Sequence, residues 1–337
     1  MVEKELDSLD RQLLDLVQSD FPLVVEPFAK LAADLSLSPE ELLDRLRRMR
    51  EMGLIRRISA IFDSRRLGYR STLAAFSVDD DRLDEVAILI NAHPGVSHNY
   101  ARTHLFNLWF TLTLPPGQDV EAAVAKLAKD AGVERYLVLP ALRVFKIGVR
   151  FKMAGEKEVT PTAEVEALTD REEASLAPSD IPLVRELQKD LNLVPRPFAH
   201  IASRLGMSEQ ELLARMEALK EAGIMRRYAA VLHHRRVGFG ANAMGCWIIP
   251  PARVEEVGRL AASFSAVSHC YERRAYPPRW PYNLFTMIHG QRREECEEVA
   301  REISFQTGIE DYILLYSTKE YKKERVNYFV EGERDED

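Results

Sequence analysis

The hydrophobic positions of the chain predict short helices first and mixed strands and helices afterwards. Apolar residues at helical spacing run through residues 9–17, 28–35 and 42–54. Ser38 and Pro39 suit the N-cap and first turn of the third helix, and Gly53 suits its end. Three short helices with a tight second turn are typical of a winged helix-turn-helix.

Beyond these helices, strand and helix patterns alternate. We expect a strand near residues 71–78, a helix near 81–92, strands near 95–102 and 105–113, a helix near 119–131 and a strand near 133–142. This order is βαββαβ, the ferredoxin-like arrangement. Sheets of this kind commonly carry helices on one face and bury the other face against a partner.

The whole pattern occurs twice. Pro27-Phe28 matches Pro197-Phe198 at an offset of 170 residues. Later the offset grows, because the insertion Arg274 to Trp280 replaces Thr103-His104 of the first copy. We therefore predict an α+β protein, a tandem duplication of a winged helix-turn-helix followed by a ferredoxin-like domain. The predicted parts are helix-turn-helix domains at 1–68 and 179–238, ferredoxin-like domains at 69–153 and 239–330, a solvated linker at 154–178 and an acidic tail at 331–337.

The composition is that of a soluble globular protein, with 46% hydrophobic and 29% charged residues among 337. No apolar run suits a membrane span, and the charged opening MVEKELDSLD lacks the core of a signal peptide, so we expect a cytoplasmic protein. Three widely spaced cysteines, Cys246, Cys270 and Cys296, argue against a disulfide framework, a zinc site or a cysteine-bound iron–sulfur cluster.

Each copy carries a histidine, a tyrosine and an arginine at alternate positions of a predicted strand. Alternate side chains of a strand share one face, so each trio forms one polar row that can engage one ligand. The rows are His98, Tyr100 and Arg102 in the first copy, and His269, Tyr271 and Arg273 in the second.

A helix-turn-helix followed by βαββαβ resembles the Lrp/AsnC regulators, with Gly53 to Arg57 and Arg66 to Tyr69 in the comparable segment. DNA binding would require a neutral or basic recognition helix, because phosphate contacts dominate affinity. In the first copy the charges of this helix cancel; in the second copy it is net negative, and the chain carries a net charge of −7. We therefore expect no DNA partner and a helical part retained as scaffold.

Two strand segments carry a more specific resemblance. Residues 97–111 read SHNYARTHLFNLWFT, residues 268–290 read SHCYERRAYPPRWPYNLFTMIHG, and the stretches FPLVVEPF and NLVPRPF lie upstream. Together they closely resemble the two subunit types of siroheme decarboxylase, here joined in one chain. The resemblance implies loss of carbon dioxide from two acetate side chains of siroheme, giving 12,18-didecarboxysiroheme on the alternative heme route or the heme d1 route. It also implies that the halves pair through their sheets as an internal pseudo-dimer, and whole chains could dimerise further.

Siroheme is a flat iron macrocycle rimmed with carboxylates, so its pocket needs apolar walls and arginines. We assign proton donation to His98 and His269, and carboxylate binding or proton relay to Tyr100 and Tyr271. No resident cofactor is required, since iron enters with the substrate. The expected substrate-binding residues are Arg102, Arg273, Arg274, Arg279, Trp280, Tyr282, Asn107, Asn283, Trp109 and Phe285.

Several alternatives stay open. His98 and His269 could be ordinary strand histidines at an interface. His104 and His289 are candidate ligands to the substrate iron, or else a polar turn residue and a hydrogen-bonded core histidine. The insertion with Arg279 and Trp280 favours the second copy as the better catalyst, and the first copy is either a second active site or a partner that completes the pocket. A DNA-binding regulator of the Lrp/AsnC type, which the charge of the chain disfavours, is the second hypothesis for the function, and a non-catalytic heme-binding sensor is the third.

Overall fold

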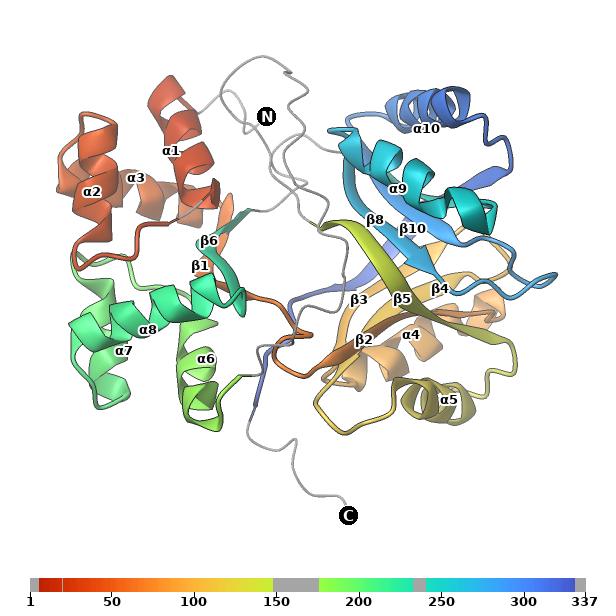
Figure 1. The fold of residues 1–337 in the computed structure, drawn as a ribbon, viewed down its shortest axis with the longest axis horizontal. Helices are drawn as coiled ribbons and strands as arrows, with labels where there is room; N and C mark the ends of the chain where they lie inside the picture. The colour runs from red at the N-terminus through yellow and green to blue at the C-terminus, as the bar shows by residue number, and fades with distance from the viewer. Residues whose placement is uncertain (1–5, 20, 148–175, 233–240, 331–337) are drawn as a thin grey trace.

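The structure is a computed structural model that describes residues 6–19, 21–147, 176–232 and 241–330 (Figure 1). The predicted α+β duplication is confirmed, with the same order of elements in both halves. The first half contains α1 (Ser8–Ser19), α2 (Pro27–Asp34), α3 (Pro39–Glu51), β1 (Ile55–Phe62), β2 (Arg70–Phe76), α4 (Leu83–Ala92), β3 (Val96–Arg102), β4 (Leu108–Leu114), α5 (Val120–Asp130) and β5 (Tyr136–Ile147). The second half contains α6 (Ile181–Leu187), α7 (Pro197–Arg204), α8 (Glu209–Glu221), β6 (Met225–Leu232), β7 (Ala241–Trp247), α9 (Val254–Ser263), β8 (Val267–Arg273), β9 (Leu284–Gly290), α10 (Arg293–Thr307) and β10 (Tyr312–Lys323).

Parts of the predicted domain plan fall outside the described residues. The predicted linker 154–178 is described only from residue 176, and the acidic tail 331–337 and residues 233–238 of the second helix-turn-helix are not described. Among the described residues, no helix is long and apolar enough to cross a membrane.

The two helical parts form one body around a β-ribbon that joins the halves. β1 pairs antiparallel with β6, for example Ala60 with Tyr228. Tyr228 is fully buried, and its ring centroid lies 5.8 Å from that of Phe21 of the first half and 5.6 Å from that of Phe198 of the second. The predicted capping of the third helix is observed, because Ser38 Oγ accepts a hydrogen bond from Glu41 N at 3.1 Å.

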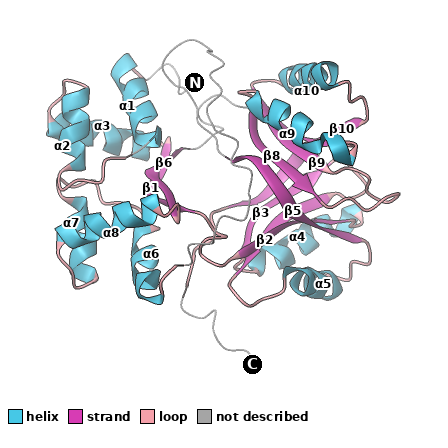
Figure 2. Ribbon diagram, in the orientation of Figure 1, coloured by secondary structure: helices cyan, strands magenta, loops and turns pink. Residues whose placement is uncertain are grey.

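The strands of the two ferredoxin-like parts close into one barrel, in the order β10-β3-β4-β2-β5-β8-β9-β7. Each half contributes a continuous run of four strands, and the runs join where β5 pairs with β8 and β10 pairs with β3. Helices α4, α5, α9 and α10 lie outside the strands (Figure 2). The halves thus form an internal pseudo-dimer that encloses the inner faces of both sheets, and β3 and β8 lie opposite each other across the barrel. Dimerisation of whole chains stays a prediction.

β5 is longer than the sequence predicts because its last residues pack against the second half of the protein. The strand continues to Ile147, and Phe145 packs at 3% exposure in the core beneath α9 and α10. Gly258 of α9 makes room for this ring: an added Cβ would lie 2.4 Å from a ring carbon of Phe145. The small residue at position 258 therefore allows the helix to sit on the crossing strand.

We expect Gly258→Ala to destabilise the protein. Alanine in a helix interior normally gains about 1 kcal/mol over glycine, but forcing a methyl group into packed atoms costs roughly 1–3 kcal/mol. Urea unfolding should show a lower midpoint for Gly258→Ala, and adding Phe145→Leu should recover part of that loss. A midpoint equal to or above that of the wild type would contradict the close contact.

Candidate active site inside the shared barrel

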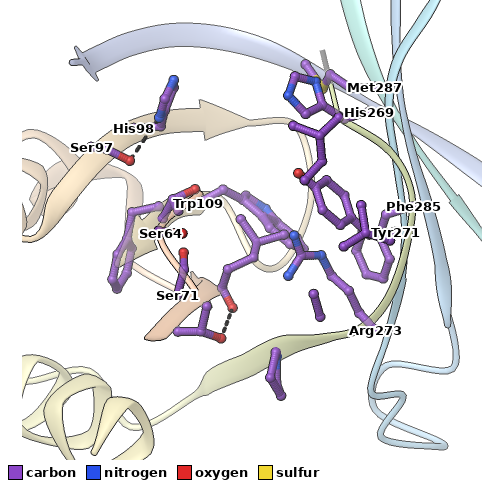
Figure 3. Close-up of a pocket in the computed structure, with 18 of the residues that line it drawn as sticks. Ser64, Ser71, Ser97, His98, Trp109, His269, Tyr271, Arg273, Phe285 and Met287 are labelled. Atoms are coloured by element: carbon purple, nitrogen blue, oxygen red, sulfur yellow. Dashed lines mark hydrogen bonds between the residues drawn. The ribbon is translucent and has the colours of Figure 1, made fainter. Parts of the chain in front are cut away.

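Both polar rows line a single cavity of about 1040 Å³, inside the barrel and toward the helical half. This volume is at the upper end of the range for ligand pockets, roughly 300–1,000 Å³. Figure 3 shows His98 on one side of this cavity and His269 with Tyr271 and Arg273 on another. Because β3 and β8 are opposite strands of the barrel, the two copies supply opposite walls of one site. The first copy therefore completes a shared pocket.

Strand alternation places each row on the inner face of the barrel. The residues between the row members point outward to the helices: Asn99 Nδ2 donates to Ala87 O of α4 at 3.3 Å, and Cys270 Sγ contacts Gly258 O of α9 at 3.6 Å. His98 and Tyr100 stack with ring centroids 6.3 Å apart, and His269 and Tyr271 do so at 6.1 Å. Each copy thus builds the same row in the same orientation.

Two arginines of the cavity, the buried Arg102 and the partly exposed Arg273, have no acidic partner among the described residues. Arg102 is 6% exposed and donates from Nη1 to Leu315 O at 2.8 Å; Arg273 donates from Nη1 to Leu139 O at 2.6 Å. The Nε of each arginine is buried without a hydrogen-bond partner. Burial lowers the pKa of both guanidinium groups to about 10. Buried cations without counter-ions are costly, so this cavity is built for an anionic ligand.

The charged residues around the cavity are mostly basic. The two acidic residues on the described part of its lining are already paired: Asp63 with Arg226 at 2.7 Å, and Glu121 with Arg274 at 3.2 Å. Seven basic side chains line the same cavity, so an excess of positive charge faces it. These are Arg65, Arg70, Arg102, Arg226, Arg273, Arg274 and Lys323.

Each predicted catalytic histidine is oriented by the serine that precedes it. Ser97 Oγ lies 3.0 Å from His98 Nδ1, and Ser268 Oγ lies 2.8 Å from His269 Nδ1. Burial, aided by the positive charge of Lys323, lowers the pKa of His98 to about 4. The imidazole of His98 is therefore neutral at pH 7 while the cavity holds no anion.

The predicted apolar walls are only partly in place. Trp109 and Phe285, at equivalent positions of β4 and β9, line the cavity. Trp280 does not: it is fully buried, with its ring centroid 5.3 Å from that of Trp109. Tyr282 packs against Trp280 at 4.8 Å and also lies outside the lining. Trp280, the last residue of the insertion, therefore packs next to the cavity without lining it.

The remaining sequence candidates separate into two groups by position. Arg274 and His289 line the cavity. Arg279 is exposed and lies over the Tyr276 ring at 5.9 Å, outside the lining. His104 Nδ1 accepts a hydrogen bond from Phe106 N at 3.0 Å, with its ring edge-on to Trp280. Its position favours a turn-stabilising role.

Asn107 and Asn283 also lie outside the cavity lining. The Asn107 amide accepts from Val78 N at 2.9 Å and donates to Val78 O at 2.7 Å. The Asn283 amide makes the same pair of bonds with Ile249, both at 2.8 Å. Asn107 thus connects the start of β4 to the segment after β2, and Asn283 connects the start of β9 to the segment after β7. These bonds favour a structural role for both asparagines.

Comparisons with known proteins match this geometry. A model of the siroheme decarboxylase NirDL-like helix-turn-helix domain matches residues 10–56 and 180–226, and an AsnC-like ligand-binding domain matches 66–146 and 236–322. A siroheme decarboxylase of Hydrogenobacter thermophilus is 46% identical over 325 residues, which cover 95% of each chain. The chain belongs to the siroheme decarboxylase family. Like that family, it is a carboxy-lyase.

Two solved structures of this family share the whole architecture. The crystal structure of the siroheme decarboxylase NirDL superposes with a TM-score of 0.75 at 42% identity, covering 96% of this chain and 95% of that one. A second NirDL structure, in complex with an iron-uroporphyrin III analogue, has the same TM-score at 41% identity and the same coverage. The fused, two-repeat form is therefore common to these siroheme decarboxylases.

Some lining residues of this siroheme decarboxylase were not predicted from the sequence. Ser97 and Ser268 were missed, although the repeated Ser-His dipeptide is a signal that could have found them. Met287 and Lys323 gave no signal, because one is an ordinary apolar strand residue and the other comes from a strand whose pairing partner lies in the other half. Arg65 and Arg226 also line the cavity, and each stands next to a second arginine in the sequence, Arg66 and Arg227.

Proposed function

We propose that this chain removes carbon dioxide from two acetate side chains of siroheme, giving 12,18-didecarboxysiroheme, inside the shared barrel cavity. The observation that carries the proposal is the pair of arginines, Arg102 and Arg273, that have no acidic partner among the described residues and lie on opposite walls of a cavity that three histidines also line. A multiply anionic disc satisfies both walls at once. The complex of NirDL with an iron-uroporphyrin III analogue supports a tetrapyrrole of this kind.

Arg102 and Arg273 hold rim carboxylates that do not react. An arginine on the reacting acetate would stabilise its ground state and slow the loss of carbon dioxide. Trp109 and Phe285 supply apolar surface. Such surface solvates a charged carboxylate poorly, so it favours conversion of the carboxylate to neutral carbon dioxide. Tyr100 and Tyr271, stacked on the histidines, hydrogen-bond the reacting acetate.

The reaction balances with protons alone. The bond between the methylene carbon and the carboxyl carbon breaks, and the methylene carbon keeps the electron pair, partly delocalised into the macrocycle. His98 or His269 then protonates that carbon, leaving a methyl group and carbon dioxide. No oxidation state changes, so we propose that the reaction needs no resident cofactor and that iron takes part only as a component of the substrate.

Binding of the substrate should favour protonation of the histidines. Burial lowers the pKa of both His98 and His289 to about 4, and the positive charge of Lys323 adds to the effect; Arg56 and Arg325 act on His98 in the same direction. The negative charge of a bound polyanion opposes the effect of these cations and raises each pKa toward its ordinary value near 6.5. Because the unliganded histidines are neutral at pH 7, the complex must take up protons as it forms.

We therefore expect proton uptake on binding and an affinity that weakens as the pH rises from 6 to 8. Isothermal titration calorimetry of siroheme binding, in buffers with different ionisation enthalpies, measures the uptake directly. The variant His98→Ala should take up fewer protons than the wild type. Binding that releases protons, or that strengthens with rising pH, would contradict this account.

The helical part offers little free positive charge for DNA. In α3 each arginine is already paired with a carboxylate, so these guanidinium groups are not available to phosphates without breaking an ion pair. The pairs are Arg45 with Asp10, Arg47 with Asp44, Arg48 with Asp10 and Arg50 with Asp190. This arrangement supports a scaffold role for the helices.

Anaerobic turnover followed by mass spectrometry tests the proposed function. The chain is incubated with siroheme without oxygen, and we expect a product that is lighter by two carboxyl groups. Binding of siroheme without any loss of mass would instead favour a non-catalytic sensor. Retardation of duplex DNA that disappears as salt is added would favour a regulator.

A further inference from the structure

The second half of the site contains a hydrogen-bonded chain of three side chains. Ser268 Oγ lies 2.8 Å from His269 Nδ1 and 2.7 Å from His289 Nε2, so one hydroxyl bridges two imidazole rings. Ser268 is 5% exposed, and both histidines line the cavity. A bridge of this kind is the geometry for coupling the protonation of two rings.

The first half lacks this chain. Ser97 Oγ contacts His98 Nδ1 at 3.0 Å, but the residue at the position of His289 is Thr113, which pairs with Ser71 across β2 and β4 as His289 pairs with Asn242 across β7 and β9. Thr113 Oγ1 hydrogen-bonds Ser71 Oγ at 3.1 Å. The two halves therefore present the same row with different support behind the histidine.

We propose that His289 is a positioning residue that acts through Ser268 on His269, fixing its tautomer and supplying the proton that His269 delivers. The inference rests on the proposed function and makes the second half the better proton donor of the two. It also gives His289 a role other than ligand to the substrate iron, since its Nε2 is already occupied by Ser268.

The single hydroxyl proton of Ser268 couples the two rings. If Ser268 donates to His269 Nδ1, then it accepts from His289 Nε2, and His269 carries its own proton on Nε2. When the substrate carbon takes that proton, the hydroxyl proton passes to Nδ1 and the His289 proton passes to the hydroxyl. His269 and Ser268 end neutral, and protonated His289 becomes neutral and regains a proton from solvent water.

The carboxylates of the bound substrate make this starting state accessible. Burial and the positive charge of Lys323 keep His289 neutral in the unliganded cavity, and the negative charge of a polyanion bound there favours the protonated imidazole. The titratable neighbours on the lining are His269 and Lys323. His289, the last of the three hydrogen-bonded side chains, therefore becomes protonated once the substrate is bound.

The test compares His289→Thr, which copies the first half, with Thr113→Val, a matched change on the side without the chain. Single-turnover reactions with siroheme, sampled by mass spectrometry, give separate rate constants for the first and second loss of carbon dioxide. We expect His289→Thr to lower one rate constant about tenfold to hundredfold and leave the other within about twofold, with siroheme affinity retained. In His289→Ala, added imidazole should restore part of the lost rate. Thr113→Val should change neither rate constant.

A second measurement separates this inference from the proposed function. In the unliganded protein, ¹⁵N NMR of the histidine rings reports which nitrogen of His269 carries the proton. We expect the Nε2-protonated form in the wild type and a mixture of forms in His289→Thr. The inference would be overturned if His289→Thr had the same two rate constants as the wild type and the same protonated nitrogen on His269. A tautomer change in a chain that never decarboxylates siroheme would support the coupling and sink the proposed function.

Discussion

Replacing Arg102 and Arg273 together by methionine is expected to weaken tetrapyrrole binding by at least about a hundredfold while making the unliganded protein more stable. Arg102 is buried and Arg273 is partly exposed, the pKa of each guanidinium is lowered to about 10 by burial, and neither makes an ion pair with a described carboxylate. A base whose pKa falls on folding destabilises the folded state wherever its charged form prevails, which here is all pH values below about 10. Methionine removes this cost at pH 7 and fills similar volume.

The same substitution removes the charged hydrogen bonds that the cavity offers to rim carboxylates. Such bonds contribute roughly 1.5–3 kcal/mol each, so losing two should weaken siroheme binding by at least about a hundredfold. Absorbance titration measures the affinity, and thermal unfolding of the unliganded protein measures the stability.

Arg279→Met is the matched control. This arginine belongs to the insertion, is exposed and does not line the cavity, so neither affinity nor stability should change. A large loss of affinity in Arg279→Met would restore the prediction that the insertion binds substrate. A double variant with unchanged affinity would show that Arg102 and Arg273 serve the fold alone.

The sequence predicts local features of this protein well because those features depend on local spacing. The alternation of His98, Tyr100 and Arg102 requires only that residues 96–102 form a strand, and the repeat at His269 has the same requirement. The two ferredoxin-like orders follow from periodicity in the same way. Both predictions hold in the structure.

What the sequence does not predict is how the halves close on each other. The ribbon of β1 with β6 and the junctions of β5 with β8 and of β10 with β3 are pairings between residues far apart in the chain, and no turn signal marks them. Without those junctions, each row looks like a separate site. With them, both rows face one cavity.

The positions of Arg279 and Trp280 outside the cavity lining are not predicted from the sequence, for a related reason. Arginine, tryptophan and proline in one loop suit an anionic aromatic ligand, but they suit a packed plug equally well. In the structure Trp280 lies among Phe106, Trp109 and Phe285 with no exposed surface, and a backbone bridge joins it to Tyr276. Only its burial, which depends on the tertiary fold, distinguishes the two roles.

Removing the two histidines one at a time is expected to stop the reaction halfway. Because β3 and β8 face each other across one barrel, we expect a single bound disc to present different edges to His98 and His269, and each histidine to protonate one methylene carbon. General acid catalysis contributes roughly 10²–10⁴-fold, so His98→Ala and His269→Ala should each slow one decarboxylation by at least about a hundredfold. Each variant should therefore accumulate a product lighter by one carboxyl group, with the remaining acetate at a different ring position in the two cases.

The double variant His98→Ala/His269→Ala should bind siroheme and release no carbon dioxide, because alanine removes the proton donors and leaves the arginines in place. His200→Ala, an exposed change on α7, controls for the loss of a histidine as such and should complete both steps. Mass spectrometry of anaerobic reactions distinguishes the products, and NMR of the demetallated products locates the remaining acetate.

If either single variant blocks both steps, the histidines act in series on every acetate, and the assignment of one donor to each acetate is wrong. If both single variants complete the reaction at the wild-type rate, the protons come from another group, for which the stacked Tyr100 and Tyr271 are the nearest candidates on the two rows.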